Sequence, residues 1–193
     1  MTHSAKSVIE RTLVGLIVAL ASWSACAGQK LVASQSELSF VSKQMGVPVQ
    51  GKFQKFDAQV NFDPKKPETG RIAFTVDLAS AALGNVEAES ELKKATWFDT
   101  AKFPKATFQS ASIKSLGADR YEVAGKLSIK GNMRDIRLPV TLARQGDLLR
   151  ASVEFNLNRA DFKIGEGEWN DPGLVANVVV VKMRLAIQGM AAG

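Results

Sequence analysis

The side chains that could do chemistry in this chain are mainly carboxylates. The stretch Glu166–Asp171 holds three carboxylates and one amide, an oxygen-rich composition that suits a calcium ion. It lacks the alternate spacing of a dedicated calcium loop, so a solvated loop is the simpler interpretation. Asp99 beside Phe98 and Asp161 beside Phe162 could act as general acids, because apolar neighbours favour a protonated carboxyl.

Cysteine and histidine chemistry depends on the N-terminus, because Cys26 and His3 are the only residues of their types. Without them the chain can form no Ser-His-Asp triad and no Cys-His pair, and it lacks the usual zinc and haem ligands. The simpler role for Asp99 and Asp161 is to cap a turn or to pair with a cation such as Arg159. We therefore predict no catalytic residue, no metal site and no enzyme activity.

The first residues predict export to the periplasm. Met1–Ala27 has the parts of a secretory signal peptide: Lys6 and Arg11 are basic, Leu13–Ala21 is apolar, and Ala25–Ala27 offers a small-x-small cleavage site. The apolar run is shorter than the roughly 20 residues that a membrane span needs. We expect cleavage to leave one domain, residues 28–193.

A lipoprotein anchored through Cys26 is the alternative, since Ser24 and Ala25 are small residues of the kind that precede an acylated cysteine. Trp23 stands where an aliphatic residue is usual, which makes this the weaker interpretation. Either way the domain has no disulfide and must be stabilised by packing, which favours a closed architecture.

The formal net charge of +6 does not predict a nucleic-acid surface. Basic residues are scattered in ones and twos, and in a strand this spacing is typical of a solvated outer face. A weak attraction to anionic lipid headgroups is compatible with it. The pairs are Lys126/Lys130, Arg134/Arg137 and Lys182/Arg184.

Alternation of apolar and polar residues dominates after Lys30 and predicts antiparallel strands with one face inside. We expect a bend at Lys55-Phe56 within the second strand. The cleanest alternation is in the third strand, and short Gly, Asn and Asp turns, including Gly131-Asn132, join the later ones. The eight predicted strands are Leu31–Val41, Val47–Phe62, Arg71–Ala79, about Lys105–Ser115, Tyr121–Lys130, Arg134–Arg144, Leu148–Ile164 and Val175–Gln188.

One short helix is expected in Gly84–Ala95, in the connection between strands three and four. Asn85 can cap it, and we expect Val86 and Leu92 to point inward. Long strands with short hairpins predict a meander closed into a barrel, since closure removes exposed edges. A sandwich is the alternative. Gly125 and Gly131 are expected to allow strands to bend.

The residues with most functional promise are apolar, because a barrel interior can be either a packed core or a cavity. The sequence alone does not separate the two. The aromatic candidates are Phe40, Phe53, Phe74, Phe98, Phe103, Phe108, Phe155, Phe162 and Trp169.

Four motifs in order resemble the YceI-like family of exported bacterial proteins. They are Val49-Gln50-Gly51-Lys52-Phe53, Trp97-Phe98-Asp99 with Phe103–Ser110, Gly125–Gly131, and Arg159–Gly165. The resemblance covers essentially the whole mature chain. It implies an all-β fold, an eight-stranded antiparallel lipocalin-like barrel, with a hydrophobic interior.

The resemblance also implies that the barrel binds a polyisoprenoid lipid, such as a quinone or a lipid carrier, with no enzymatic activity and no cofactor besides that ligand. The predicted function is to sequester or transport this lipid, with transient contact with the inner membrane. The predicted cavity lining is Phe40, Phe53, Phe74, Val76, Phe98, Phe108, Leu127, Ile129, Phe155, Phe162 and Trp169.

Three other functions stay open at this point. The first is a non-enzymatic module that docks on an inner-membrane redox or stress-response partner through Trp97–Phe103 or Glu166–Asp171. The second is a scavenger of other lipophilic compounds. The third is an unusual carboxylate- or lysine-dependent enzyme that would need Asp161. The sequence leaves a homodimer open as well.

Overall fold

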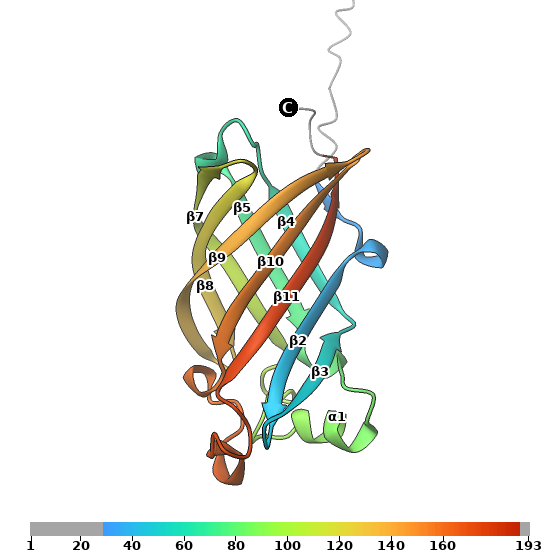
Figure 1. The fold of residues 1–193 in the computed structure, drawn as a ribbon, viewed down its shortest axis with the longest axis vertical. Coiled ribbons are helices and arrows are strands. Elements are labelled where there is room, and N and C mark those ends of the chain that lie inside the picture. Colours follow the sequence, from blue (N-terminus) through green and yellow to red (C-terminus); the bar gives the residue numbers. More distant parts are fainter. Residues whose placement is uncertain (1–28, 190–193) are drawn as a thin grey trace, which may run out of the picture.

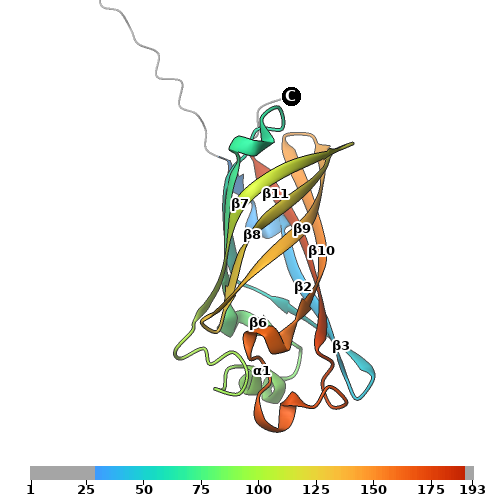
Figure 2. The ribbon, with the colours of Figure 1, turned by 90° about the vertical axis from the view of Figure 1, so that its left-hand side faces the viewer.

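The alternating segments form a closed antiparallel barrel in the computed structural model, which describes residues 29–189 (Figures 1 and 2). The expected signal peptide and Cys26 lie outside these residues. The strands are β1 (Lys30–Leu31), β2 (Glu37–Gln44), β3 (Val47–Phe53), β4 (Phe56–Asn61), β5 (Arg71–Asp77), β6 (Ala81–Ala82), β7 (Lys105–Gly117), β8 (Arg120–Ile129), β9 (Asn132–Gln145), β10 (Leu148–Asn158) and β11 (Val178–Gln188). The α-helix is α1 (Val86–Leu92).

The wall of the barrel follows the order β4-β5-β7-β8-β9-β10-β11-β2-β3. Because β3 and β4 are the halves of one bent strand, the wall has the eight strands that the sequence predicts. The short strand β1 pairs with both β11 and β4, and this double pairing closes the ring. The barrel prediction is confirmed and the sandwich alternative is wrong.

The bend in the second predicted strand falls at Gln54 and Lys55, one residue earlier than expected. The amide of Gln54 donates to the carbonyl of Ser80 at 3.1 Å, and the amide of Lys55 donates to the hydroxyl of Ser80 at 3.0 Å. Ser80 therefore replaces the strand partners that both amides lose at the bend.

The first predicted strand, Leu31–Val41, is two strands in the structure. A 3-10 turn over Ala33–Gln35 separates β1 from β2. Ser36 makes the interruption possible, because its hydroxyl donates to the carbonyl of Val32 at 2.8 Å and accepts from the amide of Ala186 at 2.9 Å. The serine side chain takes the place of a backbone ladder bond.

Strand β10 is shorter than the predicted Leu148–Ile164. It ends at Asn158, whose side chain accepts from the amide of Ala160 and caps a 3-10 turn over Arg159–Phe162. The strand after it begins at Val178 rather than Val175, which makes only an isolated bridge with Gln44.

The predicted helix forms, but it is shorter than Gly84–Ala95. Asn85 caps it as expected, since its Oδ1 accepts from the amide of Ala88 at 2.9 Å. Leu92 is half-buried against the core, as predicted. Val86 is not inward: it is 76% exposed, because it is the first residue of α1, a helix at the lower end of the barrel in Figure 1 that has no fully buried residue.

Glycines and left-handed residues shape the β8–β9 end of the barrel. The turn uses Lys130 and Gly131, with φ of 49° and 73°, and not the expected Gly131-Asn132.

Gly125, in the middle of β8, pairs with Ser110, where the register with β7 shifts. A Cβ there would lie 2.3 Å from the carbonyl oxygen of Gln109, so glycine is required for the close approach of the strands.

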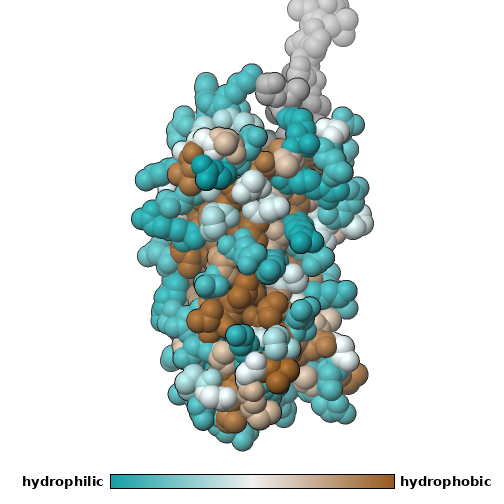
Figure 3. Space-filling view, in the orientation of Figure 1, coloured by the Kyte–Doolittle hydropathy of each residue, from teal (hydrophilic) through white to brown (hydrophobic). Residues whose placement is uncertain are grey.

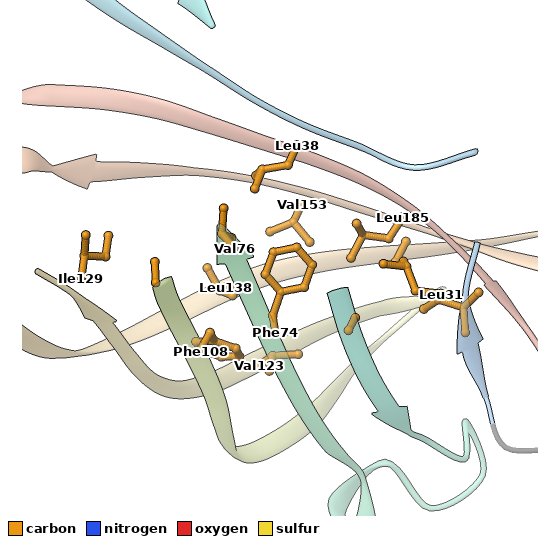
Figure 4. Close-up of a cluster of buried hydrophobic side chains, with 14 of the residues drawn as sticks. Leu31, Leu38, Phe74, Val76, Phe108, Val123, Ile129, Leu138, Val153 and Leu185 are labelled. Atoms are coloured by element: carbon orange, nitrogen blue, oxygen red, sulfur yellow. The ribbon is translucent and has the colours of Figure 1, made fainter. Parts of the chain in front are cut away.

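The inward faces meet in one hydrophobic cluster that draws on every long strand (Figure 4). Figure 4 shows Ile129 toward one end of the barrel axis and Leu31 and Leu185 toward the other. Among the described residues, no helix has the length and apolar character that a bilayer span requires.

The outer face carries most of the basic residues, as predicted. Lys126 lies 2.9 Å from Asp135, Arg137 lies 2.8 Å from Glu122, and Lys182 contacts Glu154. Such exposed pairs contribute about 0.2–1 kcal/mol each. Figure 3 shows hydrophilic residues interspersed with apolar ones over the face in view.

Candidate functional site

An apolar cavity of about 650 Å³ runs inside the barrel. At one end the lining side chains are buried and close the barrel; we call this the closed end. At the other end the cavity reaches exposed residues of β2 and of the start of α1 with its cap, namely Gln44, Asn85 and Glu87; we call this the open end. The closed end is lined by Phe62, Ile113, Tyr121, Leu149, Leu185 and Ile187.

The inward face of β2 shows how the interior changes from packed to hollow. Leu38 is 4% exposed, Phe40 and Ser42 are half-buried, and Gln44 is exposed. Strand β10 repeats the pattern, because Ala151 and Val153 are buried whereas Phe155 and Leu157 are half-buried. Side chains near the open end thus face empty volume, which a packed core would not leave.

The structure brings together ten of the eleven residues that the sequence predicts to line the cavity. Phe162 is the exception: it is 3% exposed and packs in the core under the turn that follows β10, outside the cavity wall. The ten residues on the wall are Phe40, Phe53, Phe74, Val76, Phe98, Phe108, Leu127, Ile129, Phe155 and Trp169.

Three of these aromatic rings form a contiguous row on the cavity wall. The ring centroid of Phe53 lies 5.4 Å from that of Phe40 and 6.1 Å from that of Phe98. Phe40 comes from β2, Phe53 from β3, and Phe98 from the segment between α1 and β7. The Phe74 ring stacks 5.7 Å from that of Phe56 deeper in the barrel wall.

Arg159 holds the loop that borders the open end. Only 2% of the residue is exposed, and its guanidinium donates to five backbone carbonyls and to no carboxylate. Their distances are 2.7 to 3.2 Å, and burial lowers the pKa of this guanidinium from its ordinary value. Of the two roles expected for Asp161, a turn cap or an ion pair with Arg159, the ion pair is wrong. The Asp161 carboxylate instead accepts from the Asn158 side-chain amide, within the turn, at 3.3 Å. The five carbonyls belong to Ala176, Ile164, Gly165, Trp169 and Val175.

Lys130 is a second buried cation at this end, although its spacing predicted a solvated position. It is 8% exposed, and its ammonium donates at 2.7 Å both to the carbonyl of Lys163 and to the carboxylate of Glu166. Lys130 has a left-handed backbone, and its ammonium contacts the loop instead of solvent. Together Arg159 and Lys130 fix residues 163–176 beside the opening.

The carboxylates that could do chemistry have structural partners. Glu166 pairs with Lys130, Asp171 accepts from the amide of Gly173 at 2.8 Å, and Asp99 contacts Lys102 at 3.7 Å. Within residues 29–189, no three His, Cys, Asp or Glu side chains gather into a group that could hold a metal ion. The loop Glu166–Asp171 thus acts as a border of the cavity in this structure.

Two tryptophans meet at the open end. The rings of Trp97 and Trp169 have centroids 5.7 Å apart, and both residues line the cavity. Trp97 Nε1 and the hydroxyl of Ser42 are buried with no hydrogen-bond partner among the described residues. Ser42 is a lining residue that the sequence analysis missed, because a serine in an alternating strand carries no signal of its own.

The aliphatic part of the wall and the helix were also missed. Periodicity places such residues inward, but it does not say which of them face a cavity and which are packed. These lining residues include Val49, Leu83, Ala88, Leu92, Ile136, Val179, Val181 and Met183.

Tyr121 marks the closed end. Its ring packs edge-to-face on Phe62 with centroids 5.2 Å apart, and only 6% of the residue is exposed. Burial, with a smaller contribution from the nearby Asp119, raises the pKa of the Tyr121 hydroxyl above its ordinary value of 10.0.

Comparison with known proteins gives consistent matches. The YceI-like domain matches residues 30–187. Protein YceI of Escherichia coli O157:H7 is 30% identical over 146 aligned residues, and the match covers 72% of this chain and 76% of that protein.

Two solved structures extend the comparison. BcnA of Burkholderia cenocepacia is 40% identical, with a TM-score of 0.79 over 81% of this chain and 98% of that chain. A polyisoprenoid binding domain from Saccharophagus degradans, implicated in plant cell wall breakdown, is 18% identical, with a TM-score of 0.65 over 83% of this chain and 98% of that chain. At that identity the second likeness concerns the fold alone.

Proposed function

Because the chain belongs to the YceI-like family, we propose that it is a periplasmic protein that binds a polyisoprenoid lipid in its barrel and carries it through water. The ligand would be of the quinone or lipid-carrier type. The related fold described as a polyisoprenoid binding domain supports this choice of ligand class.

The observation that carries the proposal is the cavity itself. It is lined almost wholly by hydrocarbon, it is closed at one end and open at the other, and its volume of about 650 Å³ lies within the usual range of ligand sites. A long axial cavity fits a flexible chain better than it fits a compact polar molecule.

Burial of hydrocarbon provides the binding energy. Removing the five carbons of one isoprene unit from water is worth about 3–4 kcal/mol. Such lipids reside in membranes, so the free energy that matters for exchange is the difference between bilayer and barrel. A carrier needs that difference to be small, because otherwise the ligand would be either never taken up or never released.

A binding role is supported over catalysis. The carboxylates singled out by the sequence are used in caps and ion pairs around the opening. The aromatic segments that could have been an outward contact surface instead contribute Trp97, Phe98 and Trp169 to the cavity wall. These contacts favour a lipid carrier over a module that binds a redox or stress-response partner.

The proposal is tested by purifying the protein from its own exported pool without detergent. Native mass spectrometry followed by organic extraction should give a co-purifying mass that extracts as a polyprenyl compound. Protein that is reproducibly empty and that also fails to take up added isoprenoids would refute the proposal. A different extracted lipophile would point to the scavenger function instead.

A further inference from the structure

We propose that the open end of the barrel docks on a lipid bilayer through a rim of exposed apolar side chains. We call these residues, Met45, Val47, Val86 and Leu174, the rim patch. This inference rests on the proposed function and names the surface through which the isoprenoid enters and leaves.

The rim patch consists of large apolar side chains that the fold leaves in water. Val86 is 76% exposed, Met45 is 70%, Val47 is 64% and Leu174 is 39%. They come from three separate segments: the β2–β3 hairpin, the first residue of α1, and the loop before β11. Exposed apolar residues that recur at one end of a molecule indicate an interaction surface.

These segments lie together at the same end of the barrel. The amide of Met45 donates to the carbonyl of Leu174 at 2.9 Å, which joins the hairpin to the loop. Figures 1 and 2, seen from directions 90° apart, both place the β2–β3 tip, α1 and this loop at the lower end.

Every member of the rim patch is close in sequence to a residue that lines the cavity. Met45 follows Gln44, Val47 is two residues before Val49, Val86 precedes Glu87, and Leu174 precedes Val175. The four partners, Gln44, Val49, Glu87 and Val175, are all on the cavity wall. The rim patch therefore borders the mouth of the cavity on the segments that also supply part of its wall.

A bilayer fits this arrangement better than a second copy of the chain does. Interfaces between proteins have a packed apolar centre, whereas the rim patch borders an opening. Apolar side chains that enter the headgroup and acyl boundary would let the ligand slide from hydrocarbon to hydrocarbon. A lipid that had to cross water would meet a large barrier from exposure of its chain.

The test compares two substitutions of equal chemistry at opposite ends. The rim variant is Val47→Asp, at a position that is 64% exposed, so folding is expected to be retained. The control is Leu116→Asp on β7, which is 56% exposed and lies next to the hairpin at the closed end. Transfer of a fluorescent polyprenyl lipid from phosphatidylcholine vesicles is measured by stopped flow, and binding of farnesol added from water is measured by titration.

We expect the rim variant to slow transfer from vesicles at least tenfold, while farnesol affinity stays within twofold and the control matches the wild type. Equal transfer rates for all three proteins would overturn the docking surface and leave the proposed function intact. Loss of a wild-type dimer in the rim variant, without slower transfer, would identify the patch as a self-interface instead. Failure of the wild type to bind either probe would overturn the proposed function itself.

Discussion

The ring of Phe40 lies directly over Gly51, its cross-strand partner in β3. A Cβ on Gly51 would lie 2.4 Å from Cζ of Phe40 and 2.7 Å from Cδ2 of Leu83. The absence of a side chain at Gly51 therefore leaves room for the ring of Phe40 on the cavity wall.

Gly51→Ala should displace the Phe40 ring and destabilise the protein by about 1–3 kcal/mol, as overpacking of a fitted site does. Urea unfolding measures the change. Adding Phe40→Leu to this variant should recover part of the loss, because the smaller side chain relieves the contact. If the double variant is no more stable than the sum of the two single effects predicts, the ring contact is not the cause.

Arg159→Lys should cost about 2–5 kcal/mol, because a lysine ammonium cannot replace five guanidinium bonds and leaves buried carbonyls without donors. Arg150 offers a matched control: it donates to Gln35 and Gln145 in an exposed setting. Arg150→Lys should change the free energy of unfolding by less than about 1 kcal/mol. Similar losses for both variants would contradict the role of the buried cluster.

The pKa of Tyr121 can be measured directly, because it is the only tyrosine in the chain. Its folded-state pKa is raised above the ordinary value of 10.0, so unfolding releases a proton once the pH passes 10. Stability from this group is complete below pH 10 and is lost as the pH rises toward the folded-state pKa.

Phenolate absorbance near 295 nm should therefore titrate above pH 10 in the folded protein and near pH 10 in urea. Tyr121→Phe should remove this part of the alkaline loss of stability, while the part from other groups remains. Coincident titration curves in the folded and unfolded states would show that the hydroxyl is not held at the closed end.

Ser42→Ala should stabilise the protein by about 1 kcal/mol, because it removes a buried hydroxyl that has no partner among the described residues. It should also tighten the binding of an isoprenoid hydrocarbon. Ser39→Ala, at an outward position of the same strand, is the control and should have little effect. A destabilised Ser42→Ala variant would mean that the hydroxyl has a partner in solution.

Leu127→Trp should fill part of the cavity, since Leu127 is half-buried and lines it. We expect isoprenoid affinity to fall at least tenfold with the fold retained, as measured by ligand titration and circular dichroism. The control is Lys126→Trp, the adjacent outward and exposed position. Equal affinity for both variants would mean that the ligand does not occupy the middle of the barrel.

Periodicity predicted eight strands, because a period of two fixes which side chains face inward. The choice of a barrel over a sandwich needed the argument from strand closure and the resemblance to the family. Periodicity did not predict the strand ends where a side chain replaces a hydrogen bond between strands. Ser36 interrupts the first strand, and Asn158 with Arg159 ends β10 early. The bond that interrupts the first strand joins residues far apart in sequence, and the bonds that end β10 lie inside one loop. The alternation of apolar and polar residues does not predict either kind of bond.

The site was predictable to the same extent. The aromatic residues predicted to line the cavity do line it in the structure, with the exception of Phe162. It was predicted on the wall as part of the last stretch of β10, but the chain leaves that strand at Asn158. The position of Val86 at the open end, and hence the rim patch, depended on where the helix sits relative to the barrel. Single-sequence patterns do not encode that placement.

A cavity that ends blindly measures length. Under the proposed function, a chain that entered tail first would advance only until its tip met the side chains around Tyr121 and Leu185. Short isoprenoids would then be covered completely, and longer ones would keep their head group outside. Selection among ligands would then follow the number of isoprene units rather than the chemistry of the head. The head group of every long ligand would also stay at the threshold, available to whatever receives it.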